Sequence, residues 1–235
     1  MIVSIHQPSY IPYLGYFYKM VHCDQFVYLD DAQYEKNGFI NRNRIKVSNR
    51  EELIDRVEWL TIPVKTKGRL HQSIKDVEAI GIDWAQNHID RIKEAYLKAP
   101  FYEEYITFVK NIIRGQAGPC LNVYNVLLSN ETYCLIMGNL PEWSCSSWYN
   151  IKGLKSTARL VEICKQLGAD TYLAGPGGKD YMDMSLFEKA NIKVVFSEFK
   201  VPEYRQLGKE FISNLSVLDA LFNIGAVETR KILEG

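Results

Sequence analysis

His6, Gln7 and Pro8 follow a short apolar run near the start of the chain. Imidazole can act as a general acid or base, or donate a hydrogen bond to a phosphate, and the glutamine amide both donates and accepts. The alternative is a structural His6 that bonds a loop carbonyl. Because ligands bind beyond the carboxyl ends of strands in open α/β sheets, the position of His6 after a predicted strand favours a functional role.

Two adjacent carboxylates, Asp30 and Asp31, end a second apolar run. If that run is a parallel strand beside the first, they can hold a ribose, a sugar hydroxyl or a metal ion. They can equally end the strand by capping the turn that follows. The sequence leaves both interpretations open.

The segment from residue 36 to residue 50 concentrates positive charge. Arginine can bind phosphate or carboxylate through paired hydrogen bonds, and lysine adds a point charge. We predict that this segment binds an anion beside Asp30, the alternative being a solvated loop or strand face. Its basic residues and the asparagines of its central stretch are Lys36, Asn37, Asn41, Arg42, Asn43, Arg44, Lys46 and Arg50.

A glycine-rich turn follows another predicted strand and includes Gly177, Gly178 and Lys179. Glycines allow backbone N–H groups to approach an anion closely, and the lysine can complete such a site. The spacing matches neither the Walker A loop nor GxGxxG, so the pattern is weak without its place after a strand.

Ser156, Thr157 and Arg159 open a predicted helix. A helix N-terminus with hydroxyl side chains is suited to bind phosphate, although simple capping by Ser156 or Thr157 is the more frequent role. A thiol nucleophile at Cys145 is a further alternative, without a supporting local motif. The histidines lack the spacing of a helical metal site, so no metal is expected.

The elements that must position these groups alternate between strand and helix at both ends of the chain. This alternation predicts a single α/β domain over residues 1–235 with a mostly parallel, Rossmann-like sheet and a mainly helical subdomain around residues 80–140. The predicted strands are 2–5, 25–29, 59–64, 171–174 and 193–199, and the predicted helices are 13–21, 84–98, 101–114, 121–137, 155–167, 185–189 and one from residue 217.

The composition excludes several classes of protein. The 235 residues carry 28 Lys and Arg against 28 Asp and Glu, so a surface built to coat nucleic acid is not expected. No apolar run approaches the ~18 residues of a membrane span, and the first residues lack the features of a signal peptide. Five cysteines without CxxC spacing indicate a reducing cytoplasm. The 15 tyrosines suit a sugar or nucleotide pocket, and equally a core.

Several motifs together resemble the WbqC-like protein family over nearly the whole chain. They are residues 6–17 (HQPSYIPYLGYF), 26–34 (FVYLDDAQY), 41–46 (NRNRIK), 59–64 (WLTIPV), 167–175 (LGADTYLAG), 179–183 (KDYMD) and 221–223 (LFN). Ala174 departs from the pattern, which has a small hydroxyl residue there. Residues 154–159 also resemble, more distantly, the phosphate motif of HIGH-type nucleotidyltransferases, whose second histidine is missing here.

The resemblance implies a bacterial protein of O-antigen or other surface-polysaccharide biosynthesis. We predict a transferase that acts on a nucleotide-linked sugar or another small anionic substrate; the alternative is a non-catalytic binding or scaffold protein of the same pathway. The cofactor, if the protein uses one, is left unknown by the sequence. The predicted catalytic residues are His6 and Asp30. The predicted substrate-binding residues are Gln7, Tyr10, Tyr13, Asp31, Asn41, Arg42, Lys46, Gly177, Gly178 and Lys179, and the predicted phosphate-binding residues are Ser156, Thr157 and Arg159.

Overall fold

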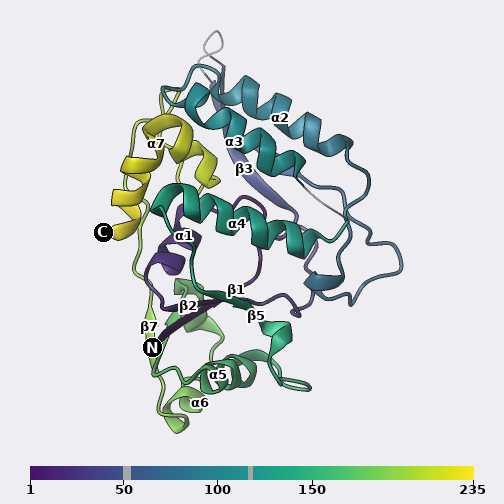
Figure 1. The fold of residues 1–235 in the computed structure, drawn as a ribbon, viewed down its shortest axis with the longest axis vertical. Helices are drawn as coiled ribbons and strands as arrows, with labels where there is room; N and C mark the ends of the chain where they lie inside the picture. The colour runs from purple at the N-terminus through teal and green to yellow at the C-terminus, as the bar shows by residue number, and fades with distance from the viewer. Residues whose placement is uncertain (50–53, 116–118) are drawn as a thin grey trace.

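A five-stranded parallel sheet forms the centre of the computed structural model, which describes residues 1–49, 54–115 and 119–235 (Figure 1). Arg50 of the basic segment therefore lies outside the described residues. The strand order is β5-β2-β1-β6-β7, and this α/β architecture confirms the predicted fold class. The strands are β1 (Ile2–His6), β2 (Gln25–Tyr28), β5 (Trp143–Cys145), β6 (Thr171–Ala174) and β7 (Lys193–Phe196).

The central strands are apolar because both faces of the sheet are covered. Along β2, Phe26 and Tyr28 pack into the core on one face, whereas Val27 packs into the core on the other. Parallel strands buried on both faces carry continuous apolar runs. This is why the sequence around β1, β2 and β6 predicts strands so clearly.

Helices cover both faces of the sheet (Figure 1). One face packs against α1 (Leu14–Val21), α4 (Leu121–Met137) and α7 (Val217–Glu234), and the other packs against α5 (Ser156–Leu167) and α6 (Met184–Lys189). α2 (Asp83–Tyr96) and α3 (Tyr102–Arg114) lie beyond the first layer, at the top of Figure 1. The helices α2 to α4 fall in the range expected for a helical subdomain, whose independence from the rest stays a prediction.

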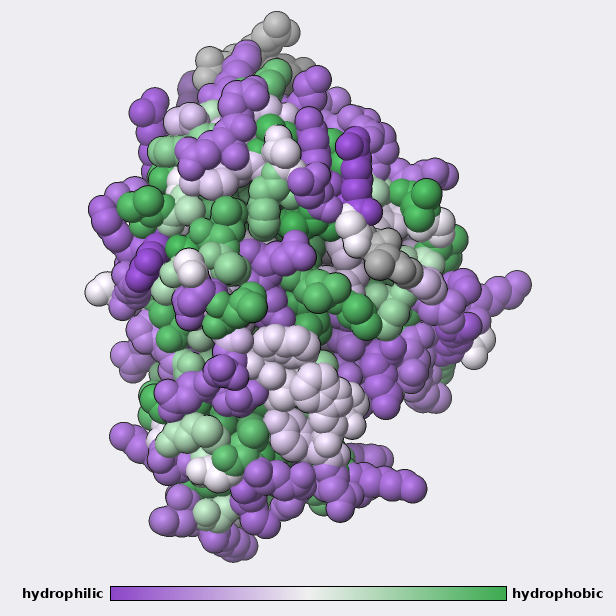
Figure 2. Space-filling model, viewed as in Figure 1, coloured by the Kyte–Doolittle hydropathy of each residue, from purple (hydrophilic) through white to green (hydrophobic). Residues whose placement is uncertain are grey.

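α4 does not keep its apolar side chains to one buried face, since the polar Asn125 and Ser129 are buried on it. Val123 and Leu127 are about half exposed on it, while Leu121 and Leu128 are buried. Figure 2 shows the apolar surface of this face gathered over the middle of the molecule, with polar side chains toward both ends.

The later part of the basic segment, from Arg42, forms a strand. β3 (Arg42–Asn49) pairs with β4 (Ile54–Thr61) in an antiparallel hairpin that is separate from the main sheet. Side chains alternate along a strand, so Arg42, Arg44 and Lys46 share one face of the hairpin, and Ile45 is buried on the other. The strand predicted at residues 59–64 is in part the end of β4.

The direction of chain progression reverses between β1 and β6. From β1 the chain passes through α1 to β2, and from β6 it passes through α6 to β7 on the opposite side of the sheet. The two crossover helices cover opposite faces, so a crevice opens beyond the carboxyl ends of β1 and β6. Open α/β sheets bind ligands at such a switch point.

Candidate functional site

His6 lies at the carboxyl end of β1, where three neighbouring cavities meet. Their volumes are about 400, 630 and 330 Å³, and His6 is part of the wall of each. We call them the Lys19 cavity, the Arg159 cavity and the Phe39 cavity, after one other residue in each wall. A cleft of this size at the strand switch is suited to a small-molecule ligand.

The imidazole of His6 is held by its own loop and packed against Tyr16. Its Nδ1 lies 2.9 Å from the carbonyl oxygen of Gln7, and the two aromatic rings meet edge to face with their centroids 4.7 Å apart. When Nδ1 donates to that carbonyl, Nε2 is left as a hydrogen-bond acceptor. Desolvation, and then the charge of Lys19, lower the pKa of His6 to about 3, so the ring is neutral at physiological pH.

Lys19 borders the candidate site but was not among the residues predicted from the sequence. It lies on α1 and is only 3% exposed, yet it is part of the wall of the Lys19 cavity together with His6. Among the described residues it has no hydrogen-bond or ion-pair partner, and burial lowers its pKa to about 7. The available signal was a lone charge inside an otherwise apolar helix, residues 14–21 (LGYFYKMV).

Asp30 is buried and fully engaged by the turn that follows β5. Its carboxylate accepts hydrogen bonds from the Ser146 hydroxyl at 3.0 Å, the Ser147 hydroxyl at 2.7 Å and the Ser147 N–H at 2.9 Å. Asp31 accepts from the same Ser146 hydroxyl and forms an ion pair with Arg159. Neither carboxylate lines the three cavities, so these contacts fix the loops around the cleft, and catalysis by Asp30 stays a prediction.

The Arg159 cavity brings together residues predicted from two separate motifs, the His-Gln-Pro loop and the start of α5. Gln7, Ser156 and Arg159 share its wall with Tyr172 and Tyr181. Burial lowers the pKa of the Arg159 guanidinium, which is paired with Asp31. A guanidinium and the start of a helix on one wall can receive an anionic group.

The predicted capping of α5 by Ser156 or Thr157 is wrong. The N-cap residue is Lys155, and no side chain bonds the first N–H groups of the helix. The Thr157 hydroxyl instead accepts a hydrogen bond at 2.9 Å from the N–H of Asp183, because the loop before α6 packs against it.

The Phe39 cavity opens between His6 and the β3–β4 hairpin. Tyr13, Asn43 and Arg44 line it beside Phe39, and Tyr13 also reaches the Lys19 cavity. The basic segment thus contributes Arg44 to the cleft, a residue that was grouped with the segment but not chosen as a ligand.

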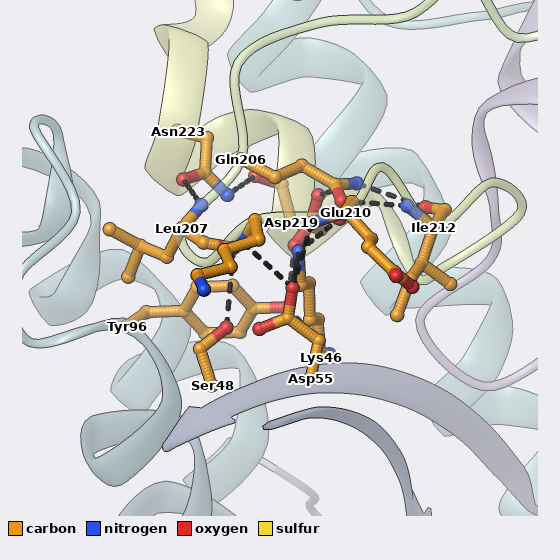
Figure 3. A network of polar contacts seen from close by, with 11 residues as sticks. Lys46, Ser48, Asp55, Tyr96, Gln206, Leu207, Glu210, Ile212, Asp219 and Asn223 are labelled. Carbon is orange, nitrogen blue, oxygen red and sulfur yellow. Dashed lines mark hydrogen bonds and ion pairs between the residues drawn. The ribbon is translucent and has the colours of Figure 1, made fainter. Parts of the chain in front are cut away.

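Four of the predicted ligands are turned away from these three cavities. The Tyr10 hydroxyl bonds Nδ1 of His88 at 2.8 Å, and the Asn41 amide bonds Tyr34 and the Ile62 carbonyl. The Arg42 guanidinium stacks over the Trp59 ring, with its Cζ 4.1 Å from the ring centroid. Lys46 pairs with Asp55 at 3.1 Å in a separate polar network (Figure 3).

The residues of the glycine-rich turn that line the cleft come just before those that were predicted to do so. Gly175 and Pro176 line the Lys19 cavity. Gly178 packs against Met182 and Phe196, and the Lys179 ammonium lies 5.2 Å from the Phe196 ring centroid. The turn is a 3-10 helix over Pro176–Asp180, and its residues after Pro176 are not part of the wall of the Lys19 cavity.

Cys145 does not have the properties of a thiolate nucleophile. It is buried at the end of β5, and desolvation together with the nearby charge of Asp30 raises the pKa of its thiol to about 12. A thiol must lose its proton to attack, so this environment opposes that role. Within the described ranges no three His, Cys, Asp or Glu residues are grouped to hold a metal ion.

The fold and the cleft define a doubly wound α/β protein with a ligand-sized site at its strand switch. The chain belongs to the WbqC-like protein family, whose model matches residues 7–231. It is 34% identical over 226 residues to the uncharacterized protein Rv1507c of Mycobacterium tuberculosis (strain ATCC 25618 / H37Rv), covering 95% of this chain and 94% of that protein. No solved structure matches. None of the helices that the structure describes is both long and apolar enough to cross a bilayer.

Proposed function

We propose that this protein is a cytoplasmic transferase of bacterial surface-polysaccharide biosynthesis that acts on a nucleotide-linked sugar or another small anionic substrate. The observation that carries the proposal is the position of His6, where three cavities meet beyond the ends of β1 and β6. Three spaces that share one polar side chain in their walls suit a reaction that joins a donor and an acceptor.

His6 is the residue to which we assign contact with the reacting group. With Nδ1 directed at the Gln7 carbonyl, Nε2 can accept a hydrogen bond from the attacking hydroxyl or amine of an acceptor. Its low pKa makes it a weak base in the empty cleft, so its first contribution is orientation of the acceptor. Gln7 and Arg159 in the Arg159 cavity are placed to bind polar and anionic parts of the substrate.

A specific observation also favours the second candidate, a non-catalytic binding or scaffold protein. His6 bonds a backbone carbonyl, and Asp30 and Arg42 do not converge on it. A scaffold would use the same cleft to hold the ligand without transferring any group.

A two-part experiment distinguishes these functions. Thermal-shift screening against sugar nucleotides, coenzyme A esters and free nucleotides identifies ligands, because binding to the folded state raises the melting temperature. Mass spectrometry then follows transfer from each stabilising donor to a panel of amino-sugar acceptors. The enzyme hypothesis predicts that His6→Gln lowers turnover by about 100-fold, because losing the group that orients the acceptor misplaces the reacting atoms.

The matched control is His71→Gln, which changes an exposed histidine. It should leave both binding and turnover unchanged. Ligand binding by the wild-type protein without any product from the panel would favour the scaffold, and unchanged turnover in His6→Gln would show that the assigned site is wrong.

A further inference from the structure

The wall of the Lys19 cavity is rich in groups that can bind an anion. Lys19 comes from α1, and Lys200 comes from the segment that joins β7 to α7. Ser197 and Ser213 add hydroxyl groups, and His6 forms the border with the other two cavities. Among the described residues of this wall there is no aspartate or glutamate. The charged side chains of the wall are therefore both basic.

Lys19 is the central observation because it is buried without a partner. A lysine that is 97% removed from solvent normally carries a carboxylate beside it, since an isolated buried ammonium is costly. Here the described residues offer no such carboxylate, and the side chain borders the cavity instead. An anionic group that enters the cavity would be the missing partner.

The walls around Lys19 are held in place by contacts elsewhere. A Cβ on Gly15 would lie 2.5 Å from the Tyr13 ring, so the absent side chain lets that ring lie across the first turn of α1. On the opposite wall, the carbonyl of Asn214 accepts a hydrogen bond at 2.8 Å from Arg44 of the hairpin. The cavity is thus bounded by fixed elements, as a preorganised binding site requires.

We propose that the Lys19 cavity is the phosphate subsite of the cleft, in which Lys19 and Lys200 bind the phosphate or diphosphate group of the substrate. The identity of that substrate as a nucleotide-linked sugar rests on the proposed function; the anion site itself does not. The subsite is on the α1 side of His6, and it involves neither Lys46 of the basic segment nor Lys179 of the glycine-rich turn.

The test uses inorganic pyrophosphate as the probe, measured by isothermal titration calorimetry on the full chain. We expect pyrophosphate to bind the wild-type protein and to bind Lys19→Met at least about tenfold more weakly, since a charge-assisted contact is lost. Methionine has a similar volume and no charge, so it fits the buried position without an unpaired ammonium. Lys231→Met on the exposed face of α7 is the matched control and should bind as the wild type does.

Lys200→Gln keeps the test valid if Lys19→Met fails to fold. Its position is exposed, and we expect pyrophosphate affinity to fall about threefold or more. Absence of pyrophosphate binding to the wild type, or equal affinity in the wild type and both cavity variants, would overturn the proposed subsite.

The outcomes also separate this subsite from the proposed function. Lysine-dependent pyrophosphate binding without turnover of any sugar nucleotide would support the subsite and leave the transferase hypothesis unsupported. Full binding and turnover of a sugar nucleotide in Lys19→Met would support the transferase and reject the subsite.

Discussion

Two lysines are almost equally buried in this protein and have opposite surroundings. Lys19 is 3% exposed and Lys46 is 2% exposed. Lys46 pairs with Asp55 at 3.1 Å and donates to the carbonyl of Glu210, whereas Lys19 has no partner among the described residues and borders a cavity. Their burial is therefore nearly the same, and the two lysines differ in whether a neighbouring group compensates the charge of the ammonium.

The surroundings of Lys46 form a closed polar network (Figure 3). Asp55 also accepts hydrogen bonds from the N–H groups of Lys209 and Glu210, at 2.8 and 2.9 Å. Nearby, Asp219 accepts from the hydroxyls of Tyr96 at 3.0 Å and Tyr204 at 2.8 Å. The contacts of Lys46 and Asp55 fasten the segment before α7 to the β3–β4 hairpin, and those of Asp219 join α7 to α2 and to that same segment. A buried charge that has such partners stabilises the architecture of the protein. A buried charge that has no partner and borders a cavity indicates a binding site for a ligand of opposite charge.

The largest expected effect concerns the pH dependence of stability in Lys19→Met. Burial lowers the folded-state pKa of Lys19 from 10.5 to about 7, so its contribution to stability is fully present above the unfolded-state pKa and is lost as pH falls toward 7. The stability of wild type relative to Lys19→Met should therefore fall by roughly 4 kcal/mol between pH 10.5 and pH 7. Urea unfolding of both proteins across this range measures the difference. A constant difference would mean that Lys19 is paired or solvated.

Lys46→Met should be strongly destabilising at neutral pH. It removes the partner of Asp55 and leaves a mostly buried carboxylate without its cation, at a cost of about 3 kcal/mol. Thermal denaturation should show a melting temperature lower by roughly 6–12 °C. The double variant Lys46→Met with Asp55→Leu is the control, since removing both charges should recover part of the loss. If Lys46→Met had the same melting temperature as the wild type, the pair with Asp55 would not stabilise the fold, and Lys46 would not differ from Lys19 in this respect.

Asp219→Asn tests the other half of the network. Desolvation raises the folded-state pKa of Asp219 from 3.8 to about 6, so its favourable contribution is present below pH 3.8 and is lost as pH rises through 6. The stability of wild type relative to Asp219→Asn should decrease by roughly 2 kcal/mol over that interval. Unfolding curves at pH 4 and pH 7 measure it, and an opposite sign would show that the hydroxyl donors outweigh burial.

The smallest effect is expected for Arg42→Met. The guanidinium lies 4.1 Å from the centroid of the Trp59 ring, and such a contact contributes about 0.5–1 kcal/mol at an exposed site. Chemical denaturation can resolve this loss, with titration by pyrophosphate in parallel. If Arg42→Met weakened pyrophosphate binding as much as Lys19→Met does, the anion would bind at the basic segment. The unpartnered Lys19 would then not mark the anion site.

Most of the regular elements could be predicted because their patterns are local. The bounds predicted for α4 and β6 coincide with those observed, and α7 begins at Val217 as predicted. β5 was not predicted because three residues, Trp143–Cys145, carry too little periodicity. β3 was treated as a polar segment because Arg42, Arg44 and Lys46 alternate along it, and the sequence does not show that Lys46 is buried.

The candidate site was predicted only in part. His6, Gln7, Tyr13, Ser156 and Arg159 were chosen from motifs, and the structure places them in the walls of the three cavities. Their roles in binding or catalysis stay predictions. Thr157 was chosen on the same grounds and turned out to bond the loop before α6, since a hydroxyl near a helix start looks the same whether it meets a ligand or a backbone N–H.

The sequence by itself determined the alternation of strands and helices and the placement of His6 at the end of a strand. Apolar runs and helical spacing are properties of neighbouring residues, so they can be read without the fold. Only the tertiary structure decided which lysine is paired and which borders a cavity. The Glu210 carbonyl that Lys46 meets is 164 residues away, and Lys200 approaches Lys19 through a long irregular segment. Contacts across such separations depend on how the layers pack, which no local pattern records.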